Sequence, residues 1–248
     1  MILALISSSP RRLATVGLVA LLVAACAVPT NPPTPSPTPV PTIPPAAPSY
    51  TLGPAPSGCP TSAPVALPVG ATATVTMTTN YGTIVIKVDA TLGPNAAGAF
   101  TALARCGYYN NVLFHRVVPG FVIQTGDGMY ARLPSLTPDK FGQGGPGWTI
   151  QDDKVTTTYK RGMLAIANLG TANSGNSQFF IVLTDDAQSS LGAEGANNYA
   201  QFGNVISGMD VVDRIAEIEV GGDPAQESFP PDMTLEPAVI TSTTVTLP

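Results

Sequence analysis

Apolar and polar residues alternate with a period of two along much of the chain beyond Ala66, in short runs separated by turn residues. The run ATATVTMTT at Ala71–Thr79 alternates small or apolar residues with threonine, which is typical of a half-buried strand. After the turn residues Asn80-Tyr81-Gly82, TIVIKV at Thr83–Val88 predicts a second strand. The further predicted strands are Val112–Val117, Phe121–Gln124, Met163–Asn168, Phe179–Leu183, Phe202–Ile206 and Val239–Leu247.

Two segments have a helical pattern instead. PNAAGAFTALAR at Pro94–Arg105 opens with a proline that suits the first helical turn, and Gly107 follows its end. Met209–Ile218 is the second predicted helix. Many short strands with two helices indicate a mainly β domain, in which a closed antiparallel barrel is capped by the helices.

The N-terminal part of the chain lacks this periodicity and carries almost no charge. Leu13–Ala25 is apolar or small and directly follows two arginines, but a bilayer-spanning helix needs about 20 such residues. We therefore interpret it as the core of a signal peptide. It ends in VAAC, which resembles the lipobox of bacterial lipoproteins and implies a signal peptide at 1–25 and an acylated Cys26. The alternative is an ordinary secreted protein whose Cys26 merely lies near the cleavage site.

Proline dominates the next segment. Ala27–Pro64 contains 14 prolines in 38 residues, interleaved with Thr and Ser, which favours extended, solvated polyproline II. We expect a Pro/Thr-rich disordered spacer at 26–65 and a folded domain at 66–248. Cys59 and Cys106 then remain in the exported chain, and they are either a disulfide that clips the spacer to the domain or two separate thiols.

Composition narrows the possible chemistry. The 11 Lys and Arg against 16 Asp and Glu give a net charge of −5, which argues against nucleic acid as a partner. The single histidine, His115, excludes multi-histidine metal sites. The glycine-rich GQGGPGW is followed by a predicted strand rather than a helix, so it is not a phosphate-binding loop. The acidic pairs at 152–153 and 185–186 are interpreted as parts of solvated loops.

Two longer motifs carry a specific likeness. They are FHRVVPGFVIQTGD at Phe114–Asp127 and RGMLAIAN at Arg161–Asn168, the latter followed by NSQFFI at Asn176–Ile181. Together with GGPGWTI and QFG they resemble the cyclophilin family of peptidyl-prolyl cis-trans isomerases, over roughly Ala71–Leu247. The resemblance implies an eight-stranded barrel with two capping helices. It also implies an isomerase that needs no metal or organic cofactor and takes proline-containing segments as its partners.

The same resemblance assigns roles to individual residues. Arg116 is the expected catalytic residue, since a fixed cation can donate to the imide nitrogen of a twisted prolyl bond. Gln124 is expected to orient the substrate carbonyl. The remaining substrate-binding residues implied by the family are Phe121, Val122, Ala167, Asn168, Gln178, Phe180, Leu191 and Tyr199.

Strand alternation divides neighbouring residues between two faces. Arg116 and His115 must point to opposite faces, as must Phe179 and Phe180, so His115 and Phe179 are predicted core residues. The sequence also departs from the common family pattern. Many members have Met where this chain has Val122, Trp where it has Ser190, and His where it has Tyr199. The loop between Leu191 and Phe202 is also extended, which leaves the alignment of Leu191 and Tyr199 open.

Taken together, these patterns predict a monomeric, exported prolyl isomerase, anchored by lipid to the bacterial cell membrane and facing outside the cytoplasm. Its expected role is to assist folding of exported proteins, in which X–Pro rotation is slow. Two alternatives come from other classes. One is a binding module that holds proline-containing segments without useful turnover, and the other is a structural surface lipoprotein whose spacer is its main feature.

Overall fold

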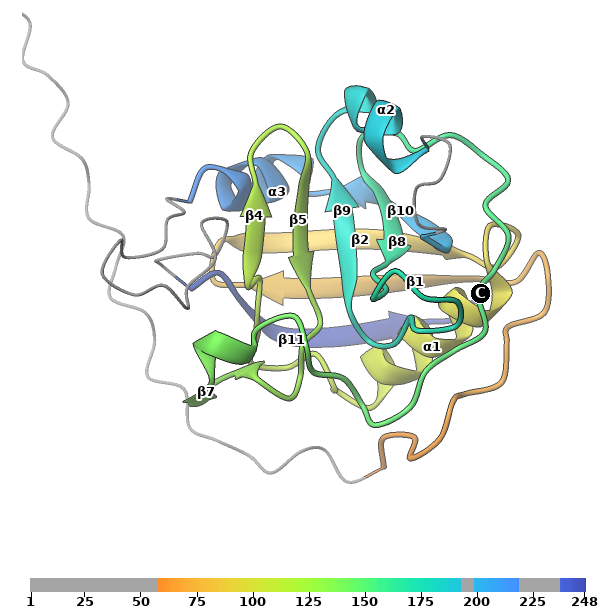
Figure 1. The fold of residues 1–248 in the computed structure, drawn as a ribbon, viewed down its shortest axis with the longest axis horizontal. Coiled ribbons are helices and arrows are strands. Elements are labelled where there is room, and N and C mark those ends of the chain that lie inside the picture. Colours follow the sequence, from red (N-terminus) through yellow and green to blue (C-terminus); the bar gives the residue numbers. More distant parts are fainter. Residues whose placement is uncertain (1–57, 193–198, 219–236) are drawn as a thin grey trace, which may run out of the picture. The chain divides into compact units, whose positions relative to one another are not determined.

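The computed structural model describes residues 58–192, 199–218 and 237–248 (Figure 1). The signal peptide, Cys26 and most of the predicted spacer lie outside these described residues. The elements in chain order are β1 (Thr72–Thr79), β2 (Gly82–Asp89), α1 (Pro94–Arg105), β3 (Val112–Leu113), β4 (Arg116–Val118), β5 (Val122–Thr125), β6 (Ala131–Arg132), β7 (Ser135–Leu136), β8 (Met163–Ile166), β9 (Phe179–Val182), α2 (Gln188–Leu191), β10 (Gln201–Ser207), α3 (Met209–Ala216) and β11 (Val239–Thr246). Short 3-10 turns lie at Pro138–Lys140 and Asp185–Ala187.

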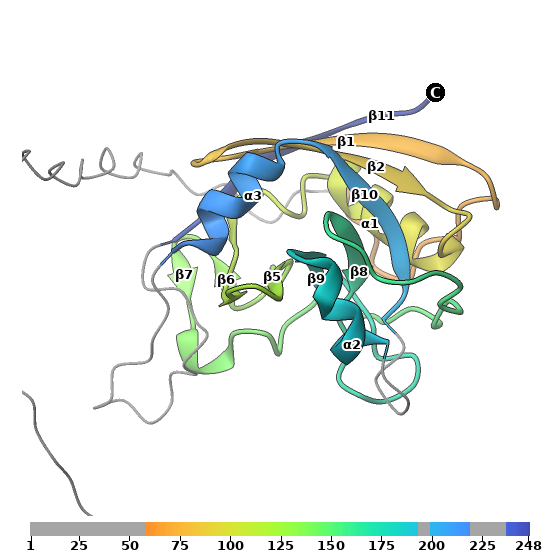
Figure 2. The same ribbon diagram turned by 90° about the horizontal axis from the view of Figure 1, so that it is seen from above.

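The described strands form one antiparallel sheet in the order β4-β5-β9-β8-β10-β2-β1-β11-β3-β6-β7. The sheet curls, and helices α1 and α3 lie at opposite ends of the curl in both views (Figures 1 and 2). The prediction of a mainly β, antiparallel fold is confirmed, but the described residues contain three helices instead of the two expected to cap the barrel. The third described helix, α2, was not predicted, because a single four-residue turn carries no recognisable periodicity.

The expected closed barrel of eight strands is wrong in detail, because the described sheet is open and has eleven strands. The predicted strand Val112–Val117 is two strands, β3 and β4, which belong to opposite ends of the sheet. Where β3 ends and before β4 begins, Leu113 and Phe114 bond to two other segments. The N–H of Phe114 donates to Ala238 O at 2.8 Å, and Thr125 Oγ1 donates to Leu113 O at 2.8 Å. The chain itself therefore joins the two ends.

The main core lies inside the curl. Along β1 the inward positions Ala73, Val75 and Met77 are buried, whereas the alternate threonines are half-buried, as period-two patterning requires. A group of aromatic rings fills the centre, with Phe100 5.1 Å from Phe179 and 4.8 Å from Phe202 between centroids. The rings pack tilted or edge to face, the geometry that aromatic pairs prefer.

The N-terminus of α1 is capped from a distant segment. Gly93, at the cap position, has no side chain, and Asp153 supplies the carboxylate instead. Its Oδ2 accepts the N–H of Ala96 at 2.8 Å, and its Oδ1 accepts the backbone and side-chain N–H groups of Asn95 at 3.2 and 2.9 Å. The expectation that residues 152–153 form a solvated pair is therefore wrong for Asp153, which is 6% exposed. The helix N-terminus stabilises the buried charge.

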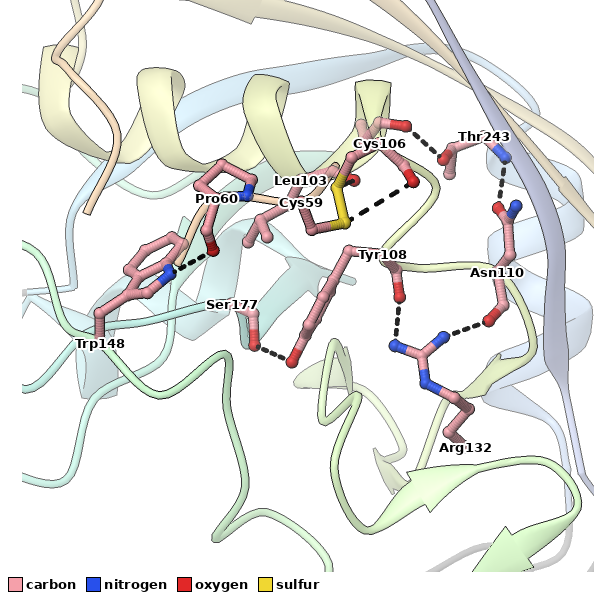
Figure 3. Close-up of a disulfide and its surroundings, with 11 residues drawn as sticks. Cys59, Pro60, Leu103, Cys106, Tyr108, Asn110, Arg132, Trp148, Ser177 and Thr243 are labelled. Atoms are coloured by element: carbon pink, nitrogen blue, oxygen red, sulfur yellow. Dashed lines mark hydrogen bonds between the residues drawn. A yellow bond between two sulfur atoms is a disulfide. The ribbon is translucent and has the colours of Figure 1, made fainter. Parts of the chain in front are cut away.

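A disulfide joins Cys59 to Cys106, with a Cα–Cα distance of 5.1 Å (Figure 3). The bond attaches the segment before β1 to the end of α1. Next to it, Trp148 Nε1 donates to Pro60 O at 3.0 Å. Of the two alternatives left open by the sequence, the structure contains the disulfide.

The segment from 58 to 67 runs alongside α1 and packs against it. At its far end the N–H of Leu67 donates to Pro94 O at 3.0 Å. In between, the backbone comes so close to Gly98 that a Cβ there would lie 2.5 Å from Val65 O, an approach that only glycine permits. Residues 58–65, which the sequence assigned to the spacer, thus pack on the domain. Their packing could not be predicted from the proline-rich composition, because it depends on contacts with residues far along the chain.

Candidate active site

Strand register aligns three functional candidates across the sheet. Arg116 in β4 lies opposite Gln124 in β5, Gln124 lies opposite Phe180 in β9, and Phe180 lies opposite Ala165 in β8. Residues that are directly opposite each other project from the same face of a sheet. A second row on this face contains Val118, Val122 and Val182. Cation, amide and aromatic ring therefore share one surface.

The two faces of this part of the sheet have different surroundings. Phe179 is fully buried in the main core, whereas Phe180 belongs to a second apolar cluster on the other face. His115 is also fully buried, with its ring 6.2 Å from the ring of Phe141. The prediction that His115 and Phe179 are core residues is confirmed. Arg116, next to His115, is half-buried on the face of Phe180.

A cavity of about 180 Å³ opens on this face. A smaller cavity of about 30 Å³ adjoins it and shares Gln124, Ala167 and Asn168. The larger cavity is lined by Arg116, Phe121, Val122, Gln124, Ala167, Asn168, Phe180, Leu191 and Tyr199. The remaining predicted substrate-binding residue, Gln178, lines the smaller cavity. The structure thus brings together every site residue that the resemblance implied within the folded domain, including Leu191 and Tyr199.

The larger cavity has an apolar wall that extends into a buried cluster. The ring of Tyr199 stands edge-on to the ring of Phe180, with centroids 5.3 Å apart and an interplanar angle of 86°. Leu191, at the end of α2, and Val122 are buried in the same cluster. Such a wall excludes water and suits an apolar ring.

Behind this wall lies Tyr159, which the sequence analysis missed. Its side chain is 2% exposed and belongs to the cluster of Phe180 and Leu191. Its hydroxyl donates to Tyr199 O at 2.9 Å, and burial raises the pKa of Tyr159 to about 12. Tyr159 lies in the aperiodic stretch TTTYK, where a lone aromatic residue among polar ones was the only signal.

The polar side of the cavity is fixed by side-chain amides. Gln124 Nε2 donates to Gln178 Oε1 at 3.0 Å. Gln178 Nε2 in turn donates to Gly142 O at 2.9 Å and to Gly144 O at 2.8 Å. Because both N–H groups of Gln178 are engaged, its carbonyl oxygen must face Gln124.

Asp127, at the end of the first motif, binds the loop at Gly142–Gly144 whose carbonyls accept the hydrogen bonds from Gln178. Its Oδ2 accepts the N–H groups of Gly142 and Gly144 at 2.9 and 3.1 Å. Its Oδ1 accepts those of Met129 and Tyr130 at 3.1 and 2.9 Å. The carboxylate is fully buried, and these four donors offset its desolvation. Asp127 is the last residue of the motif FHRVVPGFVIQTGD, and nothing in the residue pattern indicated this role.

Two further observations concern ligands and membranes. Across the described ranges, no group of three or more His, Cys, Asp or Glu residues is placed to hold a metal ion. Within the same part of the chain, no helix has the length and apolar character needed to cross a bilayer. The arrangement that is present can bind an apolar ring beside a cation and an oriented amide.

Comparison with known proteins agrees with this arrangement. In fold, the chain resembles a crystal structure of a Cryptosporidium parvum cyclophilin type peptidyl-prolyl cis-trans isomerase, with a TM-score of 0.55 and 24% identity over 71% of this chain and 99% of that one. A second structure of that protein, in the presence of the dipeptide Ala-Pro, gives a TM-score of 0.54. At this identity the likeness defines the class of fold.

The sequence comparison goes further. Residues 74–245 match the family described as cyclophilin type peptidyl-prolyl cis-trans isomerase. Peptidyl-prolyl cis-trans isomerase B of Escherichia coli is 33% identical over 173 residues, which cover 69% of this chain and 98% of that protein. A probable peptidyl-prolyl cis-trans isomerase of Brucella abortus is 33% identical over 144 residues, covering 57% of this chain and 70% of that protein. The chain belongs to the cyclophilin-type peptidyl-prolyl cis-trans isomerase family, and its enzyme class is isomerase.

Proposed function

We propose that the larger cavity binds the proline ring of an X–Pro segment and that Arg116 catalyses rotation of the preceding peptide bond. Rotation breaks amide resonance, so the imide nitrogen regains its lone pair in the twisted transition state. A cation that donates to this nitrogen stabilises the transition state more than either planar isomer. A charge-assisted hydrogen bond contributes roughly 1.5–3 kcal/mol, or about ten- to a hundredfold in rate.

One observation carries the proposal. Arg116 and Gln124 are direct partners across β4 and β5, and both line the cavity whose apolar wall contains Phe180. A proline ring against Phe180 would thus lie beside both a permanent donor and an amide that can orient the substrate carbonyl. The remaining rate enhancement would come from the orientation of the substrate and the exclusion of water.

Cis-trans exchange of an X–Pro peptide, followed by NMR, tests the proposal. The comparison is between the wild-type protein, Arg116→Ala, and Arg214→Ala as a matched control. Arg214 is an exposed arginine on α3 that pairs with Asp210 at 3.0 Å. We expect wild type and Arg214→Ala to accelerate exchange equally, and Arg116→Ala to lose about ten- to a hundredfold in kcat/KM.

Other outcomes would contradict specific parts of the proposal. Peptide binding by wild type without faster exchange would show the binding module rather than the isomerase. Equal acceleration by wild type and Arg116→Ala would remove Arg116 from the mechanism.

We further propose that the enzyme is exported, anchored to the membrane through an acylated Cys26, and active as a monomer on X–Pro bonds of other exported proteins. The basic, apolar and small-Cys order of residues 11–26 supports the anchor. The disulfide between Cys59 and Cys106 supports an oxidising compartment outside the cytoplasm.

Fractionation of cells after labelling with a fatty-acid analogue tests the anchor. We expect labelled protein in the membrane fraction for wild type, and unlabelled, unprocessed protein for Cys26→Ser. Wild-type protein that is cleaved but carries no lipid label would instead indicate ordinary secretion. A structural lipoprotein would show the same label without any isomerase activity.

A further inference from the structure

Tyr159 makes two hydrogen bonds that connect it to both flanks of residues 193–198. Its N–H donates to Gln188 Oε1 at 2.6 Å, and its hydroxyl donates to Tyr199 O at 2.9 Å. Gln188 begins α2, the helix that ends with Leu191. Leu191 and Tyr199 both line the larger cavity, one from each flank. Tyr159 is therefore hydrogen-bonded to both segments that contribute Leu191 and Tyr199 to the cavity.

The segment that carries Tyr159 is itself tied to the start of β10. Thr157 Oγ1 donates to Gln201 Oε1 at 3.1 Å, and Gln201 Nε2 donates back to Thr157 O at 3.0 Å. Thr157 and Gln201 each lie two residues from Tyr159 and Tyr199, which share the other hydrogen bond. Residues 157–159 thus form a fixed support along the backbone of 199–201.

We propose that Tyr159 is a positioning residue for the prolyl site, an inference that rests on the proposed function of the cavity. Its hydroxyl fixes the backbone of Tyr199, so that the Tyr199 ring stands edge-on to Phe180 and closes the apolar wall. Tyr159 is not among the residues that line the cavity, and its hydroxyl acts on the site through Tyr199. Its expected effect is on how tightly the site holds the proline ring.

Burial supports a constant role over the working pH range. The hydroxyl lies in an apolar cluster, and desolvation raises its pKa to about 12. Tyr159 therefore remains a neutral donor to Tyr199 throughout the pH range of an exchange assay.

Tyr159→Phe removes the hydroxyl and keeps the ring, and Tyr109→Phe is its matched control. Tyr109 is also fully buried, and its hydroxyl also donates to a backbone carbonyl, Ser177 O at 3.1 Å, but its ring packs in the main core. We expect both variants to be destabilised to a similar extent. Only Tyr159→Phe should lower kcat/KM, by about three- to tenfold, and weaken peptide binding by a similar factor. An equal loss of activity in Tyr109→Phe would overturn the proposal.

A double-mutant cycle with Tyr199→Ala separates positioning from general loosening. Tyr199→Ala removes the ring but leaves the carbonyl that Tyr159 binds. If Tyr159 acts through that ring, Tyr159→Phe has no further effect on kcat/KM in the Tyr199→Ala background. The same fold-loss in both backgrounds would show that the hydroxyl acts by another route.

Peptide affinity, measured by NMR titration of the same X–Pro peptide, tests the positioning role of Tyr159 even if the proposed isomerase mechanism fails. If wild type binds the peptide without accelerating exchange, the isomerase mechanism fails. Weaker binding by Tyr159→Phe than by Tyr109→Phe would still support the positioning role. Equal binding by these two variants overturns that role, and a wild-type protein that neither binds nor isomerises overturns both.

Discussion

Gln124 and Gln178 share a hydrogen bond of 3.0 Å, in which Gln124 Nε2 is the donor and Gln178 Oε1 the acceptor. Gln178 is held in turn by the carbonyls of Gly142 and Gly144, whose N–H groups bind the buried carboxylate of Asp127. A continuous chain of hydrogen bonds thus runs from a loop to the polar side of the cavity. It determines how Gln124 presents its amide to a bound peptide.

Gln178→Ala should therefore impair catalysis without removing any predicted catalytic group. It releases Gln124 and leaves the carbonyls of Gly142 and Gly144 without their side-chain donor, at a cost of about 1–3 kcal/mol in stability. We expect kcat/KM to fall about five- to tenfold. Gln143→Ala is the control, because Gln143 lies on the same loop but is exposed. NMR exchange assays of both variants test this prediction. Wild-type activity in Gln178→Ala would show that its hydrogen bonds do not position Gln124 for catalysis.

The adjacent pair Phe179 and Phe180 offers a test of the two faces of β9. Phe179→Leu should lower the free energy of unfolding by about 1–2 kcal/mol, because it loses edge contacts with Phe100 and Tyr109. Its kcat/KM should remain that of wild type. Phe180→Leu should instead lower kcat/KM about five- to tenfold, through the wall that it forms with Tyr199.

Denaturant unfolding and exchange assays on both variants, at a temperature where both are folded, provide the comparison. If Phe179→Leu lost as much activity as Phe180→Leu, the two faces would not be functionally distinct.

The disulfide should contribute stability and leave catalysis unchanged. It closes a loop with a sequence separation of 47, for which chain entropy gives about 3–4 kcal/mol. The double variant Cys59→Ser/Cys106→Ser should unfold at correspondingly lower denaturant concentration, with wild-type kcat/KM while folded. Reductant should destabilise the wild type and have no effect on the double variant. A reductant-sensitive kcat/KM in folded wild type would instead couple the bond to the site.

Alkaline pH should destabilise the fold through buried tyrosines. Burial raises the pKa of Tyr159 from 10.0 to about 12, and it also raises those of Tyr108 and Tyr109. Above pH 10 the unfolded chain loses a proton from Tyr159 that the folded chain keeps until about pH 12. The stabilisation from Tyr159 is therefore complete below pH 10 and lost as the pH rises through 12.

Urea unfolding between pH 8 and pH 11.5 tests this linkage. The difference in unfolding free energy between wild type and Tyr159→Phe should shrink as the pH rises above 10, because the variant lacks one titrating group. A constant difference over that range would show that the pKa of Tyr159 is not raised.

Periodicity along the chain was enough to predict most of the regular strands and helices, and two motifs were enough to indicate the family. Alternation alone separated Phe179 from Phe180 and His115 from Arg116, because successive residues of a strand face opposite sides. These are local properties, and local patterns can be read without knowing which segments meet.

Contacts between segments far apart in the chain could not be predicted in this way. Asp153 caps a helix that begins more than fifty residues earlier, and the hydroxyl of Tyr159 binds a carbonyl 40 residues away. The docking of residues 58–67 on α1 and the division of Val112–Val117 between two ends of the sheet have the same origin. Each of these contacts satisfies backbone or side-chain groups that come together only once the chain has folded. The hydrophobic periodicity of the sequence carries no information about which distant groups pair.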